Sequence, residues 1–80
     1  MNVTILAFGI AKDIFGGSEV TIEIDTNATV FNLRSALEQA YPQLKKLATY
    51  RVALNNEYAQ DGNVIGDRDE IAIIPPVSGG

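Results

Sequence analysis

The sequence predicts an α+β fold in which a mixed β-sheet packs against one main helix. Three observations support this class. Two strand patterns follow each other closely, at 3–8 and 18–25, and one long amphipathic helix pattern follows at 30–41. Further strand patterns come after the helix, at 50–55 and from 69 or 70 to 74. A hairpin, a helix and then more strands are typical of one sheet covered by one helix.

The first hairpin is predicted from two apolar segments. Residues 3–8 are apolar on both faces, and residues 18–25 alternate between apolar and polar side chains. Residues 11–15, between them, favour a short helical turn. Because this connection is short, we expect the two strands to pair antiparallel. The core-facing residues of the second strand are expected to be Val20, Ile22 and Ile24.

The main helix has a predicted start and a predicted end. Thr29 is a suitable N-cap, because its hydroxyl can accept a hydrogen bond from a backbone N–H of the first turn. Apolar residues then recur at helical spacing over 30–41. Pro42 ends the helix, because the residue before a proline is pushed out of the α region. Residues 44–47 favour one further turn.

The second half of the chain reads as shorter strands joined by a loop. Residues 50–55 predict a strand, and 57–59 predict a very short return strand after an Asn-Asn turn. Residues 60–69 predict a loop that leads into the last strand. The residues expected to point into the core from this region are Val52, Leu54, Val64 and Ile65.

The order of these elements points to one arrangement. If the last strand lies beside the first and runs parallel to it, the sheet is mixed and the connection right-handed. That arrangement is the ubiquitin-like β-grasp. We therefore expect a β-grasp domain over residues 1–76 and an extended C-terminal tail over residues 77–80.

The composition fits one small globular domain and limits its partners. The chain has 80 residues and a formal net charge of −4, so charge gives it no attraction to nucleic acid or to an anionic membrane. It would be steered toward basic protein surfaces instead. The N-terminus lacks the basic region of a signal peptide, and no apolar run reaches membrane-spanning length. We therefore expect a cytoplasmic location.

The sequence contains no cysteine and no histidine. This excludes a disulfide framework, a thiolate nucleophile, a zinc site of Cys/His type and a histidine general base. The acidic segment 61–70 lacks the ligand spacing of an EF-hand, so we expect no metal site. These absences predict a chain without a complete active site of its own.

The C-terminal residues carry the most specific functional signal. Pro75 and Pro76 end the last strand, because proline has no backbone donor and favours polyproline II geometry. The four residues beyond them span at most about 14 Å when extended, which predicts a thin tip. Glycines at the end of such a tip suit a narrow channel. The residues expected to thread it are Pro75, Pro76, Val77, Ser78 and Gly79, with the carboxylate of Gly80 as the reactive group.

That carboxylate needs another protein to activate it. A terminal carboxyl group has a pKa of about 3.3–3.7, so it is ionised and unreactive at neutral pH. The only internal glycine pair, Gly16-Gly17, lacks the pattern of a phosphate-binding loop.

The segment from Asp69 to Gly80, ending in Pro-Pro-Val-Ser-Gly-Gly, resembles the C-terminal signature of the small subunit of molybdopterin synthase. The first strand with Phe8, the helix start at Thr29-Val30 and the segment 52–55 are also similar to that family. The resemblance covers essentially the whole chain. Two positions depart from the family pattern: they are Tyr58, where a smaller aliphatic residue is frequent, and Ile74, where Phe is common.

The resemblance implies a sulfur carrier in molybdenum cofactor biosynthesis. In that family an E1-like activating enzyme uses ATP to adenylate the terminal glycine, here Gly80, which then becomes a thiocarboxylate. The tail enters the large synthase subunit and donates sulfur to a pterin precursor, forming the dithiolene of molybdopterin. The resemblance thus implies a non-catalytic subunit of a heteromeric sulfurtransferase. It implies no tightly bound cofactor and two protein partners, the large subunit and the activating enzyme.

A partner surface is expected beside the tail. Leu6, Phe8, Ala72 and Ile74 fall on strand faces opposite to the core-facing set, and Tyr58 would lie near them. A single helix covers only one face of such a sheet, which favours an exposed apolar patch over a second core layer. In the resembling family this region docks on the large subunit and on the activating enzyme. Lys12 is a further candidate contact near the tail, or simply an exposed lysine.

Other functions remain open at this point. A sulfur carrier of thiamine biosynthesis or another pathway would use the same terminal chemistry. A ubiquitin-like protein modifier would instead join Gly80 to lysines of other proteins. A β-grasp interaction module with an idle tail is the plainest alternative.

Overall fold

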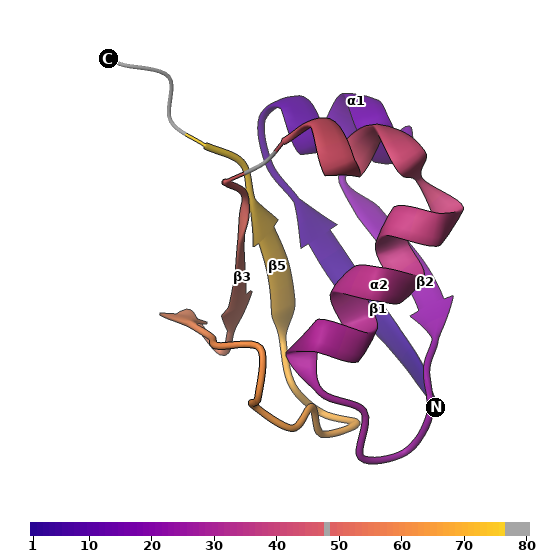
Figure 1. The fold of residues 1–80 in the computed structure, drawn as a ribbon, viewed down its shortest axis with the longest axis vertical. Coiled ribbons are helices and arrows are strands. Elements are labelled where there is room, and N and C mark those ends of the chain that lie inside the picture. The colour runs from indigo at the N-terminus through magenta and orange to yellow at the C-terminus, as the bar shows by residue number, and fades with distance from the viewer. Residues whose placement is uncertain (48, 77–80) are drawn as a thin grey trace.

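The computed structural model of the chain describes residues 1–47 and 49–76. Figure 1 shows one twisted sheet with helix α2 lying across one face of it. The elements in chain order are β1 (Asn2–Ala7), α1 (Ile10–Phe15), β2 (Glu19–Glu23), α2 (Val30–Ala40), the 3-10 helix η1 (Pro42–Lys46), β3 (Arg51–Leu54), β4 (Glu57–Tyr58) and β5 (Ile71–Ile74).

The sheet is mixed and has the strand order β2-β1-β5-β3-β4. β1 and β2 form the expected antiparallel hairpin. β5 lies between β1 and β3; it runs parallel to β1 and antiparallel to β3. The predicted ubiquitin-like β-grasp arrangement, with a mixed sheet on one main helix, is therefore confirmed.

The core lies between the sheet and α2. Alternate residues of the two central strands point toward the helix, and the apolar stripe of α2 faces them. Full burial of a Leu or Ile contributes about 1.5–3 kcal/mol relative to leaving it exposed. The facing apolar side chains of the central strands and of α2 therefore account for most of the free energy gained by packing. The large side chains with no exposed surface are Ile5, Leu33, Leu37, Leu44, Ile71 and Ile73.

Helix α2 begins and ends where the sequence predicts. The Thr29 hydroxyl accepts a hydrogen bond from the Asn32 N–H at 3.3 Å, and the Asn32 side-chain oxygen accepts one from the Thr29 N–H at 3.0 Å. This reciprocal capping box satisfies two backbone donors of the first turn, and losing such a cap costs about 1 kcal/mol. Pro42 follows the helix and opens η1, which buries Leu44 completely.

One core prediction is wrong, and the reason is local geometry. Val64 is 57% exposed, whereas its neighbour Ile65 is buried as expected. Val64 forms an isolated antiparallel bridge with Thr29, which holds this part of the loop extended. Successive side chains of an extended segment point in opposite directions. Because Ile65 points inward, Val64 must point outward.

A polar network joins α2 to the start of β3 and to the loop after β4. Arg34 donates to the Tyr50 hydroxyl at 3.2 Å and forms an ion pair with Asp61 at 2.8 Å. The Tyr50 hydroxyl in turn donates to the Glu38 carboxylate. Burial first, and then the hydrogen bond to Glu38, raise the pKa of Tyr50 to about 12. The folded state therefore holds this hydroxyl in its neutral form.

We expect Tyr50 to make the free energy of unfolding fall at alkaline pH. The pKa is raised from 10 to about 12 on folding, so its contribution is complete below pH 10 and is lost as pH rises through the folded value. Tyr50→Phe should lower stability near neutral pH, because Glu38 and Arg34 lose their partner. In the variant, the free energy of unfolding should also fall less steeply above pH 10 than it does in the wild-type protein. Urea melts of both proteins at pH 8, 10 and 12 check this, and parallel declines would contradict it.

Candidate functional site

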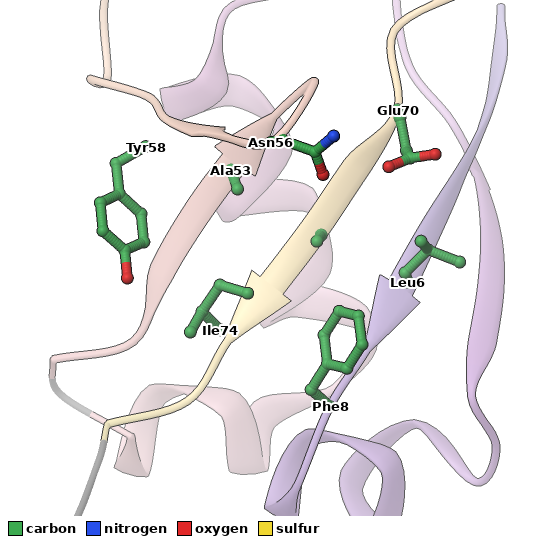
Figure 2. Close-up of a pocket in the computed structure, with 8 residues that line it drawn as sticks. Leu6, Phe8, Ala53, Asn56, Tyr58, Glu70 and Ile74 are labelled. Atoms are coloured by element: carbon green, nitrogen blue, oxygen red, sulfur yellow. The ribbon is translucent and has the colours of Figure 1, made fainter.

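An apolar groove of about 380 Å³ lies on the face of the sheet turned away from α2. Figure 2 shows its side chains projecting from the strands, with the helix behind them. The residues that line it are Leu6, Phe8, Ala53, Asn56, Tyr58, Glu70, Ala72 and Ile74.

Strand register explains why this face is hollow. Ala72 of β5 pairs with Leu6 of β1 on one side and with Ala53 of β3 on the other. Ala53 also pairs with Tyr58 of β4. Two alanines at the centre of this row form a low floor between larger side chains. The Phe8 ring, which follows β1 and is 46% exposed, stands beside that floor at the end where β5 finishes.

The Tyr58 side chain, which lines one side of the groove, contacts a neighbouring cation. The Arg51 guanidinium lies 4.0 Å from the centre of the Tyr58 ring. Such a cation–π contact at an exposed site contributes about 0.5–1 kcal/mol. Tyr58 itself is 61% exposed. The contact therefore restricts an aromatic side chain that solvent would otherwise leave free to rotate.

The opposite end of the groove is polar and fixed by a tight turn. Asn55 and Asn56 both adopt positive φ, at 53° and 70°, the conformation of a type I′ hairpin turn. The Asn55 N–H donates to the Glu70 carbonyl at 2.8 Å, and the Asn55 side-chain oxygen accepts from the Glu70 N–H at 3.0 Å. These bonds fix the turn against Glu70, and Figure 2 shows the Asn56 and Glu70 side chains at the same end of the groove.

The same turn anchors a second carboxylate. Asp69 accepts hydrogen bonds from the Gly66 N–H at 2.8 Å and from the Asn55 side-chain amide at 3.0 Å. The Gly66 N–H, followed by the Asn55 amide, lowers the pKa of the Asp69 carboxyl below its ordinary value. Both donors stabilise the ionised form. The turn beside the groove therefore holds Asp69 in its ionised form.

Comparison with known protein families shows to which family this chain belongs. The sequence profile of the ThiS family matches residues 5–80. This chain belongs to the ThiS family. The match extends from the first strand through the tail.

Curated relatives of this ThiS-family chain have two kinds of name. A molybdopterin synthase sulfur carrier subunit from Dictyostelium discoideum is 41% identical, with 95% of this chain and 93% of the relative covered. A small archaeal modifier protein 1 from Haloferax volcanii is 32% identical, with 91% and 94% covered. The resemblance to the small subunit of molybdopterin synthase that the sequence indicated is confirmed.

Solved structures agree with the fold of this ThiS-family member. The crystal structure of the Haloferax volcanii SAMP1 protein superimposes with a TM-score of 0.86 at 29% identity, and both chains are fully covered. A complex of subunits 1 and 2 of the molybdopterin-converting factor from Helicobacter pylori contains a chain that matches with a TM-score of 0.68 at 26% identity, again with full coverage of both.

The structure brings together four of the five residues predicted to contact a partner. Leu6, Phe8, Tyr58 and Ile74 all line the groove. Lys12 does not: it lies on α1, where its exposed side chain is outside the groove lining and its carbonyl accepts the Gly16 and Gly17 N–H groups. Of the predicted tail residues, Pro75 and Pro76 follow β5, and Val77, Ser78, Gly79 and Gly80 lie outside the described residues.

Three groove residues were not indicated by the sequence. Ala53, Asn56 and Glu70 join the site through the register of β3 with β5 and through the turn between β3 and β4. The Asn-Asn pair was the available signal, because it predicts a tight turn that must end near a neighbouring strand.

Two further searches of the described residues bear on the kind of site. Within residues 1–47 and 49–76, no three acidic side chains gather as ligands for a metal ion. In the same part of the chain, no helix combines the length and apolar character needed to cross a bilayer.

We expect Asn55→Ala to raise the pKa of the Asp69 carboxyl toward its ordinary value. Asp69 has a lowered pKa, so its contribution to stability is present above the unfolded value and is lost as pH falls through the folded one. Carboxyl-carbon NMR titrations of both proteins measure the shift directly. An unchanged Asp69 titration would show that the Asn55 amide does not stabilise the carboxylate.

Proposed function

We propose that this chain is the sulfur carrier subunit of a molybdopterin synthase. The observation that carries the proposal is its full-length similarity to curated proteins of that name. The chemistry of the chain supports it. With no cysteine in the sequence, a transferable sulfur atom would have to be bound at the carboxyl terminus.

In this proposal Gly80 is the reacting residue. An activating enzyme joins the Gly80 carboxylate to the AMP portion of ATP and releases pyrophosphate. Hydrosulfide then attacks the acyl carbon, which forms the carbon–sulfur bond of a thiocarboxylate and releases AMP. The chain itself binds no cofactor tightly, because ATP belongs to the activating enzyme. We infer a cytoplasmic location, where ATP and both partner proteins would be available.

The groove is the surface that we propose to dock on the large subunit. Interface energy concentrates in a few well-packed apolar anchors, and aromatic residues are enriched among them. Phe8 and Tyr58 have this character and stand on either side of the alanine floor. Glu70 at the polar end suits a basic group on the partner. The proposed tail begins at the other end, beyond Ile74, so docking and delivery of the tail would occur together.

A second candidate function has its own support. The similarity to small archaeal modifier protein 1 is also full-length, and the structure of that protein superimposes closely. A modifier would pass the activated Gly80 carbonyl to a lysine amine instead of to a sulfur nucleophile. The two functions share the activation step and differ in the acceptor.

Mass spectrometry of the chain isolated from its native cell tests both functions. For a sulfur carrier, we expect a fraction of the intact chain to be heavier by the difference between one sulfur and one oxygen atom. For a modifier, we expect tryptic peptides in which a lysine of another protein carries residues 69–80 of this chain, because Arg68 is the last tryptic site before Gly80. Deletion of Gly80 should remove either signal. Native protein that shows only the second signal would overturn the sulfur carrier proposal.

Phe8→Asp should weaken binding to the large subunit without unfolding the free domain. Truncating an anchor of this kind costs about 2 kcal/mol or more of binding free energy, or roughly 30-fold in Kd. Phe31→Asp is the matched control, because Phe31 is 57% exposed but lies on α2, behind the sheet. The measurements are a thermal melt and a binding titration for each protein. Equal affinities for the two variants would remove Phe8 from the docking surface.

A further inference from the structure

Gly9 occupies a backbone conformation that other residues rarely adopt. It connects β1 to α1 with φ 56° and ψ −132°. This region is open to glycine because glycine has no Cβ atom, and a side chain there strains the backbone. The chain uses this conformation to turn sharply between Phe8, which stands at the groove, and Ile10, which begins α1.

The same glycine also lies against the start of the tail. A Cβ atom built on Gly9 would be 3.2 Å from the Cγ atom of Pro75, closer than ordinary van der Waals contact. Strand pairing explains the proximity. Ala7 and Ile73 are register partners in the parallel pair β1–β5, and Gly9 and Pro75 each follow two residues later. Two strand ends thus run side by side until the backbone at Gly9 turns away.

We propose that Gly9 is a positioning residue that sets the direction in which the chain leaves β5. Its bare backbone gives the Pro75 ring a place to pack, and the ring in turn orients Pro76. Because the Pro-Pro pair is stiff, a small displacement of Pro75 also displaces Pro76. This inference rests on the proposed function, in which the C-terminal residue must reach a reacting centre on the large subunit.

The positions of Phe8 and Gly9 assign docking and the direction of the tail to two different residues. Phe8 contacts the docking partner, and Gly9, the next residue, contacts the root of the tail. A side chain at Gly9 should therefore leave docking nearly intact and misdirect the tail. Misplacing a reacting group by about 1 Å can lower a rate about 100-fold.

The test compares alanine at three glycines. Gly9→Ala introduces both a positive-φ side chain and the clash with Pro75. Gly16→Ala introduces positive φ at 78° with no atom within 4 Å of the new Cβ, and Gly62→Ala introduces neither strain nor contact. Each chain is loaded with sulfur at its C-terminus. Its single-turnover transfer is then followed with saturating large subunit, and the Kd of the complex is measured separately.

We expect Gly9→Ala to lower the transfer rate by about 10- to 100-fold while changing Kd less than about 3-fold. Gly16→Ala and Gly62→Ala should transfer at the wild-type rate, even though Gly16→Ala also places a side chain at positive φ. Equal losses of rate at Gly9 and Gly16 would mean that backbone strain alone is responsible, and the positioning role would be rejected.

Pro75→Ala tests the contact from its other side and leaves the Gly9 backbone unstrained. It removes the ring that Gly9 supports, so it should slow transfer without weakening docking. The double variant Gly9→Ala/Pro75→Ala should transfer no more slowly than Pro75→Ala alone, because the clash is gone. Additive losses would show that the two residues act independently, which would overturn the proposal.

A structural readout keeps the positioning role separate from the proposed function. Residual dipolar couplings of the Cα–Hα bonds of Ile74, Pro75 and Pro76 report the chain direction in the free protein. They should change in Gly9→Ala and stay unchanged in Gly16→Ala. If the wild-type chain carries no sulfur, the proposed function fails while these couplings still decide the role of Gly9. Unchanged couplings in Gly9→Ala would reject that role.

Discussion

The parallel pairing of β1 with β5 is the contact on which the fold and the candidate site both depend. It joins the first strand of the chain to the last described one, with Ile5 beside Ile71 and Leu6 beside Ala72. One face of this pair forms the centre of the core, and the other face forms the groove. The pairing also brings Gly9 to Pro75. Without it, the docking surface and the root of the tail would be unrelated parts of the molecule.

Features that depend on neighbouring residues were predictable from the sequence. The strand at β1, the cap at Thr29 and the end of α2 before Pro42 are all properties of short segments, and all are present. The two faces of a strand follow from its period of two, so the sequence also indicated that Phe8 would lie opposite the core. The resemblance of the tail to a known family needed no structure at all.

Features that depend on the pairing of distant strands were not predictable in the same way. Ala53 and Glu70 have no local pattern that marks them as groove residues; the register of β3 with β5 places them there. The role of Gly9 required knowledge of a backbone angle and of a proline far away in sequence. Val64 is a case in which a local feature gave the wrong prediction. Its apolar character suggested burial, but a bridge to Thr29, which is distant in sequence, turns its side chain outward.

The strand order has a consequence for how the protein forms as it is synthesised. β5 fills the position between β1 and β3, yet among the described strands it is the last in the sequence. A nascent chain that ends before β5 has an open gap at the centre of its sheet and no complete groove. Contacts between residues so far apart in sequence also form late and close a large loop. A chain that stops before β5 therefore cannot form the groove, because Ala72 and Ile74 are missing and β1 and β3 have no strand between them.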